Sequence, residues 1–177
     1  MTATRAPAAS AAPEVWLRGP IEGVAAALQP VAHSLLQVRE ELGVALAGLG
    51  ERELWLRPGG AAAIGFHLLH LAGSTDRLFS YARAEGLSEA QRVALDAERD
   101  PPRESLEALL RRLDGVIGAA LAQLRATDPA TLADPRAVGR AGLPSTVGGL
   151  LFHAAEHAQR HAGQAVTTAR IVRGSGL

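Results

Sequence analysis

Apolar residues recur at spacings of three and four along most of the chain, which is the periodicity of amphipathic helices. Four long segments carry this pattern, and no segment shows the alternation expected of a strand. The predicted helices cover about residues 20–47, 62–85, 102–126 and 145–172. The chain is therefore predicted to be all-α.

Residues typical of helix boundaries stand near the ends of these segments. Pro20 suits a first turn, whereas Pro30 lies inside the first pattern and is expected to kink or interrupt the helix there. Asp100, which precedes two prolines, predicts the start of the third helix. Gly86 and Gly174 predict the ends of the second and fourth helices. Either Ser145 or Thr146 is expected to cap the fourth helix, because the hydroxyl oxygens of serine and threonine can accept a hydrogen bond from a backbone N–H of the first turn.

The segments between the helices differ in length. Residues 51–60 read as a loop, residues 127–144 as a linker containing proline, and residues 87–101 as a long connection with a helical turn at about 88–97. Four amphipathic helices joined in this way predict a four-helix bundle. We expect one bundle domain over residues 16–177, after a disordered leader over residues 1–15.

Composition excludes several kinds of chemistry. The 177 residues include 18 arginines, no lysine and no cysteine, and the formal net charge is zero. A lysine Schiff base, a thiolate nucleophile and a cysteine-ligated metal are therefore excluded. The charge balance argues against nucleic-acid partners, and the absence of a long apolar run argues against a membrane span. These features predict a cytoplasmic protein.

Histidine spacing is the most informative chemical pattern. His153, His157 and His161 lie four residues apart on the fourth predicted helix. Neighbours at this spacing share a helix face and could share a metal ion, but the outer two are about 12 Å apart along the axis. On a helical wheel His161 lies within the apolar face, His157 at its edge and His153 further out. The pair expected to point inward is therefore His157 and His161.

An inward pair of imidazoles needs partners, because leaving each unsatisfied in the core costs about 1–3 kcal/mol. Gln164, Thr168 or Ser74 could supply hydrogen bonds. A bound metal would satisfy the pair as well, and histidine-only ligands favour Zn²⁺ or Ni²⁺. The pairing at this spacing, with more histidines on another helix, favours metal binding.

Residues 153–157 also match H-x-x-E-H, the inverted zincin pattern of metalloproteases. Such enzymes need an acidic ligand further along the chain, and no Asp or Glu follows Glu156. Glu156 falls on the outward face with Arg160 four residues later. The protease interpretation is therefore disfavoured, and no general base can be assigned.

The second predicted helix supplies His67 and His70. Periodicity mildly favours His67 as the inward residue, because it lies nearer the apolar stripe through Ile64 and Leu68. His33 stands alone on the first helix and is expected to be an ordinary surface or core residue.

Two segments resemble the DinB/YfiT-like superfamily. Residues 57–60 read RPGG and residues 63–72 read AIGFHLLHLA, which is similar to the family's entry into its second helix. Residues 146–164 read TVGGLLFHAAEHAQRHAGQ, which is similar to the family's last helix. The family's metal-binding histidines fall on His70, His157 and His161 of this chain. The resemblance thus favours His70, and leaves His67 as a neighbour or alternate ligand.

The resemblance implies a four-helix bundle with up-down-down-up topology, in which residues 86–101 supply the long crossing connection. It also implies a divalent metal, Zn²⁺ or Ni²⁺, and an S-transferase that joins a small-molecule thiol to an electrophilic substrate. A metal-dependent hydrolase, a non-catalytic metal-binding module and a structural bundle stay open as alternatives. A homodimer is common in such bundles, although the outer faces show no defined apolar seam.

Overall fold

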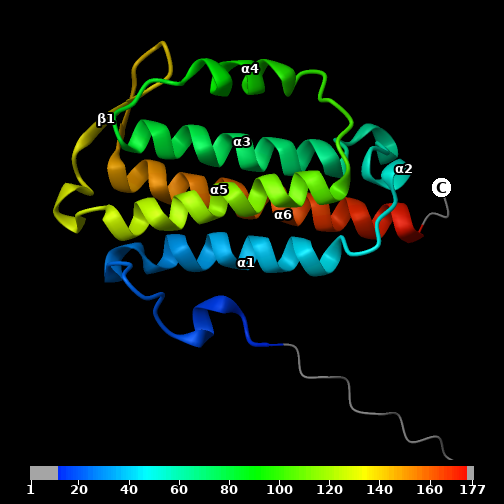
Figure 1. The fold of residues 1–177 in the computed structure, drawn as a ribbon, viewed down its shortest axis with the longest axis horizontal. Helices are drawn as coiled ribbons and strands as arrows, with labels where there is room; N and C mark the ends of the chain where they lie inside the picture. Colours follow the sequence, from blue (N-terminus) through cyan, green and yellow to red (C-terminus); the bar gives the residue numbers. More distant parts are fainter. Residues whose placement is uncertain (1–11, 175–177) are drawn as a thin grey trace, which may run out of the picture.

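Four long helices packed side by side form the body of the molecule (Figure 1). A computed structural model describes residues 12–174. The four helices are α1 (Gln29–Ala45), α3 (Ile64–Ala82), α5 (Leu106–Ala126) and α6 (Val147–Gly174). The predicted all-α, four-helix-bundle architecture is confirmed. Of the predicted leader, residues 1–11 lie outside the described residues.

The helices have up-down-down-up topology. In Figure 1, α1 and α6 run in one direction and α3 and α5 run in the other. Two consecutive helices can be parallel only if the chain crosses the length of the bundle between them. The short helix α4 (Glu89–Ala97) makes this crossing and lies beside α3. Ser88 caps it by accepting a hydrogen bond from the Gln91 backbone.

The core of the bundle is made of aliphatic residues. Leucine, valine and isoleucine line the inner faces of α1, α3 and α5, whereas α6 contributes mainly alanines. Small side chains allow α6 to approach α3 closely, which matters because both helices carry histidines at this contact. The fully buried residues include Leu35, Leu42, Leu68, Leu71, Leu113, Ile117, Ala158, Ala162 and Ala165.

The first helix begins later than predicted. It starts at Gln29, so that Pro30 occupies the first turn, where its missing N–H costs nothing. Of the two expected effects of Pro30, the structure therefore shows an interruption of the helical pattern and not a kink. The Gln29 amide bonds the backbone of Ile21 and Val24, which holds the preceding turn. That segment contains the 3-10 helices η1 (Val15–Arg18) and η2 (Ala26–Leu28).

Two other helix ends differ from prediction. The helix α3 ends at Ala82 instead of at Gly86, because Ala84 adopts a left-handed conformation with φ of 61°. The helix α5 begins at Leu106 instead of after Asp100, because Ser105 provides the cap by accepting a bond from the Ala108 backbone. The residues between α4 and α5 are therefore non-helical.

The connections contain short elements that the sequence pattern did not reveal. The predicted loop at 51–60 contains α2 (Glu51–Leu54) and the 3-10 helix η3 (Pro58–Gly60). The linker before α6 contains the 3-10 helix η4 (Pro129–Thr131) and an antiparallel hairpin. Its strands, β1 (Pro135–Val138) and β2 (Leu143–Thr146), pair Pro135 with Thr146. Thr146 then caps α6, accepting a bond from the Gly149 backbone, as predicted.

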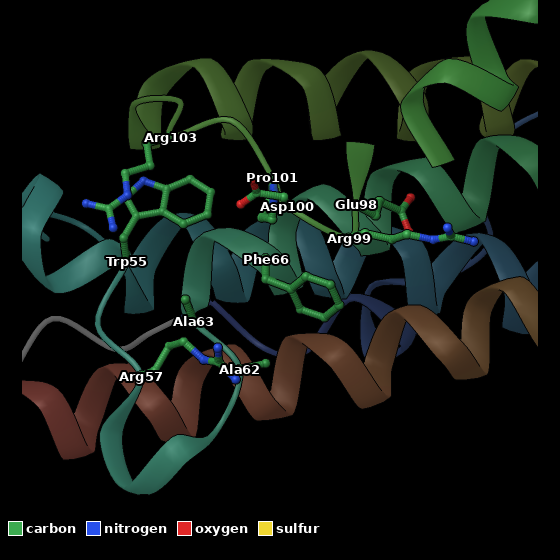
Figure 2. Close-up of a pocket in the computed structure, with 10 residues that line it drawn as sticks. All are labelled: Trp55, Arg57, Ala62, Ala63, Phe66, Glu98, Arg99, Asp100, Pro101 and Arg103. Carbon is green, nitrogen blue, oxygen red and sulfur yellow. The ribbon is translucent and has the colours of Figure 1, made fainter. Parts of the chain in front are cut away.

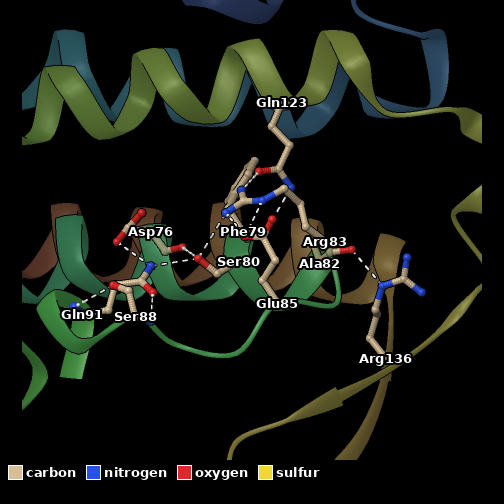
Figure 3. A network of polar contacts seen from close by, with 10 residues as sticks. All are labelled: Asp76, Phe79, Ser80, Ala82, Arg83, Glu85, Ser88, Gln91, Gln123 and Arg136. Atoms are coloured by element: carbon tan, nitrogen blue, oxygen red, sulfur yellow. Dashed lines mark hydrogen bonds and ion pairs between the residues drawn. The ribbon is translucent and has the colours of Figure 1, made fainter.

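A polar network ties the end of α3 to its neighbours (Figure 3). The Gln91 amide donates to Asp76 and Ser80, each at 2.8 Å, and thereby fastens α4 to α3. The Gln123 amide of α5 donates to the Phe79 carbonyl at 3.0 Å. Arg136 of β1 donates to the Ala82 carbonyl at 2.8 Å. These bonds attach α4, α5 and β1 to the last turns of α3, and Gln91 fixes the start of α4 beside that helix.

Within the described residues, no helix combines the length and the apolar character needed to cross a membrane.

Candidate metal centre

Three histidines from two helices meet inside the bundle. The helix α3 supplies His70, and α6 supplies His157 and His161 from successive turns. One ligand atom from each lies within 4.8 Å of the other two. All three side chains are partly buried. The structure therefore brings together the three residues on which the sequence resemblance places a metal.

The spacing of the ring nitrogens fits a shared ion. His70 Nε2 lies 3.0 Å from His157 Nε2. Two nitrogens bound to one zinc ion at about 2.1 Å, at angles between about 90° and 109°, are about 3.0–3.4 Å apart. The rings of His157 and His161 are also close, with centroids 4.5 Å apart. These three histidines could hold one divalent metal ion.

The electrostatic setting keeps two of these imidazoles neutral. Burial lowers the pKa of His157, and the nearby His70 lowers it further. Burial, followed by His70 and His157, lowers the pKa of His161 to about 4. Both rings are therefore unprotonated at neutral pH, the state in which histidine binds a metal.

Glu98 orients His70. Its Oε2 accepts from His70 Nδ1 at 2.7 Å, and its Oε1 accepts from Arg77 at 2.7 Å. With Nδ1 donating, the His70 lone pair lies on Nε2, which faces His157. Burial acts to raise the pKa of Glu98, but the hydrogen bonds from His70 and Arg77 outweigh it, and the pKa is lowered. A carboxylate that holds the second nitrogen of a histidine ligand is typical of metal centres.

Glu98 is the C-terminal capping residue of α4, and it reaches the centre because α3 has no side chain at residue 73. A Cβ on Gly73 would lie 2.6 Å from Glu98 Oε1 and 2.7 Å from an Arg77 nitrogen. Sequence reasoning missed Glu98. The only available signal was general, namely that ligand histidines tend to have carboxylate partners.

The other histidines lie around the three or away from them. His67 is buried, and its Nδ1 lies 3.0 Å from His161 Nδ1, so it contacts one of the three without belonging to their group. His153 is exposed and lies 3.5 Å from Glu156. Glu156 forms an ion pair with Arg160, which agrees with its expected outward position. His33 lies against the Gly19 carbonyl, at 3.0 Å.

Comparison with known proteins assigns the family. A family model of the DinB superfamily matches residues 4–165. The chain belongs to the DinB superfamily. A crystal structure of a conserved protein from Enterococcus faecalis has the same fold, with a TM-score of 0.66 at 21% identity, over 83% of this chain and 97% of that one. No curated protein matches the chain significantly. The three histidines are thus the candidate metal centre of a DinB bundle.

Proposed function

We propose that this DinB protein is a metal-dependent enzyme of the thiol S-transferase type. The observation that carries the proposal is the meeting of His70, His157 and His161, with Glu98 directing His70 toward the other two. Three protein ligands leave coordination positions for a co-substrate, which is the arrangement of catalytic rather than structural sites.

Each of these residues has a specific role in the proposed reaction. His70, His157 and His161 would hold Zn²⁺ or Ni²⁺, while Glu98 keeps His70 in the tautomer that presents Nε2. When bound, such an ion lowers the pKa of a coordinated thiol and makes thiolate available at neutral pH. The chain has no cysteine, so the thiol belongs to a small-molecule co-substrate. The thiol proton would pass to solvent, the thiolate sulfur would bond to the electrophilic carbon of the acceptor, and the leaving group would depart with the electron pair of its broken bond.

Metal analysis tests whether the three histidines bind a metal ion. The untagged protein is purified without chelator and analysed for metals beside His157→Ala and His153→Ala. His153 is the matched control because it lies one turn before His157 on α6 but is exposed and outside the group of three. We expect about one zinc or nickel per chain in the wild type and His153→Ala, and loss in His157→Ala. A wild type without metal after reconstitution would contradict the proposal.

An activity assay tests whether the metal-loaded protein transfers a thiol to an electrophile. The metal-loaded protein is assayed with small thiols and a chromogenic aryl halide as the acceptor. We expect product only when thiol, acceptor and metal are all present, and none with His157→Ala. Release of the halide by metal-loaded protein without thiol would favour the hydrolase instead. Stoichiometric metal without turnover over a broad set of thiols would favour a non-catalytic metal-binding module.

A further inference from the structure

A cavity of about 420 Å³ lies beside the candidate metal centre, between the connection that precedes α3 and the segment that follows α4 (Figure 2). Two of its lining residues also contact His70. Glu98 accepts the His70 hydrogen bond, and the Phe66 ring is stacked on the His70 ring, with centroids 5.6 Å apart and planes 8° apart. A molecule in this cavity would therefore be a neighbour of the metal centre.

The wall of the cavity carries an excess of positive charge. Arg57, Arg99 and Arg103 line it. Figure 2 shows Arg57 and Arg103 on opposite sides of Trp55, with Arg99 toward the other end of the cavity. The carboxylates that line it are Asp100 and Glu98, and Glu98 is already paired with Arg77.

The arginines of this cavity have few partners of their own. Elsewhere most arginines in the described part of the chain donate to a carboxylate or to a backbone carbonyl, as Arg18 does to Glu40. Among the residues that the structure describes, Arg99 and Arg103 have no such partner. Arg57 has only two long bonds, each of 3.4 Å, to carbonyls of its own loop. Their guanidinium groups are thus available to an anion, which they bind through charge-assisted hydrogen bonds.

Apolar surfaces complete the cavity. The Trp55 indole is held in place, because its N–H donates to the Glu104 carbonyl at 3.2 Å. It lies against α3 at Gly65, where a Cβ would be 2.7 Å from the ring. Phe66 and Pro101 add further apolar surface. A fixed aromatic ring beside cationic groups suits a ligand that has both an apolar body and a negative charge.

We propose that this cavity binds a small organic carboxylate, and that this carboxylate is part of a substrate of the neighbouring metal centre. The inference rests on the proposed function in this last respect only. Arg57, Arg99 and Arg103 would supply the positive charge that selects an anion for this cavity, while Trp55 and Phe66 would contact the apolar body of the ligand. The cavity volume falls within the range of small-molecule sites.

Trp55 provides a direct binding signal. The chain has two tryptophans, and the other, Trp16, is largely exposed on η1. In a Trp16→Phe background, Trp55 fluorescence reports occupancy of the cavity. The probes are isophthalate, an aromatic dianion, and isophthalamide, its neutral counterpart of the same shape. Metal-free protein is used first, so that binding is measured independently of the metal.

We expect isophthalate to bind about ten-fold or more tightly than isophthalamide. The double variant Arg99→Gln with Arg103→Gln should weaken isophthalate binding by about ten-fold or more. The control double variant, Arg140→Gln with Arg170→Gln, makes the same change in net charge outside the cavity and should leave binding unchanged. Equal binding of the two probes, or equal losses in the two double variants, would overturn the proposal.

Two further experiments distinguish failure of this proposal from failure of the proposed function. Isophthalate should still bind His157→Ala, and loss of binding there would show that the carboxylate binds at the histidines and would overturn the cavity assignment. Failure of metal loading, by contrast, would leave carboxylate binding intact. With zinc-loaded protein, 3-mercaptobenzoate is compared with benzoate. A preference for the thiol that depends on zinc assigns the carboxylate to the thiol co-substrate, and equal affinity assigns it to the acceptor.

Discussion

The contact between Glu98 and His70 allows a quantitative prediction for Glu98→Gln. The carboxylate accepts two hydrogen bonds of 2.7 Å, from His70 and from Arg77, and its side chain is only 11% exposed. A glutamine of the same shape offers one oxygen and one NH₂ group, so it can accept from only one of these donors. Its NH₂ group must then face the other.

Both orientations of the amide carry a cost. If the NH₂ group faces His70, then His70 Nδ1 must become an acceptor, and Nε2 gains the proton and loses the lone pair that a metal needs. If it faces Arg77, a buried guanidinium loses its charged partner, which costs about 1–3 kcal/mol of folding free energy. Loss of the group that hydrogen-bonds a ligand histidine typically weakens metal binding about 10–100-fold, or by about 1.4–2.8 kcal/mol.

Zinc affinity is measured by competition with a chromogenic chelator, and the stability of the metal-free protein by denaturant unfolding. The control is Glu104→Gln, which removes another carboxylate from the same segment, one that pairs with the more exposed Arg112 at 2.7 Å. That variant should keep the wild-type zinc affinity and lose at most about 1 kcal/mol of stability. Equal zinc affinities for Glu98→Gln and the wild type would refute the assigned role of Glu98.

Three further predictions follow from local geometry. Gly73→Ala should destabilise the protein by about 1–3 kcal/mol in denaturant unfolding and weaken zinc binding, because its Cβ would displace Glu98 or Arg77. The control is Gly115→Ala, which has nothing within 4 Å of the added Cβ and should stabilise the protein by about 0.5–1 kcal/mol. Ala84→Gly should raise stability by about 1 kcal/mol, because Ala84 has a φ of 61°. A chelator should lower the melting temperature of zinc-loaded wild type but not that of His157→Ala, since zinc at about 100 times its Kd adds about 2.7 kcal/mol.

The parts of the fold that could be predicted from sequence are those with a long periodic signal. Each of α1, α3, α5 and α6 repeats its apolar spacing over four or more turns, and all four were predicted as helices. The hairpin of β1 and β2 has four residues in each strand, too few for an alternation to be recognised. Pro30 could be placed either inside a helix or at its start, and spacing alone could not decide between the two.

The metal centre could be predicted in part for a similar reason. His157 and His161 lie four residues apart on one helix, so local spacing alone places them on one face. The helical wheel predicts that His67 points further inward than His70, and His67 is the more buried of the two. Burial is a poor guide to a ligand, however, because the ring must reach a common point. His70 does so at the edge of the apolar stripe.

Glu98 and the cavity arginines could not be found by spacing, because their positions depend on the crossing connection. Glu98 lies 28 residues after His70 and meets it only because α4 runs back along α3 for a definite length. The chain has 18 acidic residues, and no local pattern distinguishes this one from the others. The crossing that up-down-down-up topology requires thus also delivers the carboxylate to His70, and brings Arg99 and Arg103 to the cavity beside it. Shortening α4 by one turn should therefore abolish both the Glu98 contact and carboxylate binding, while leaving His157 and His161 in place.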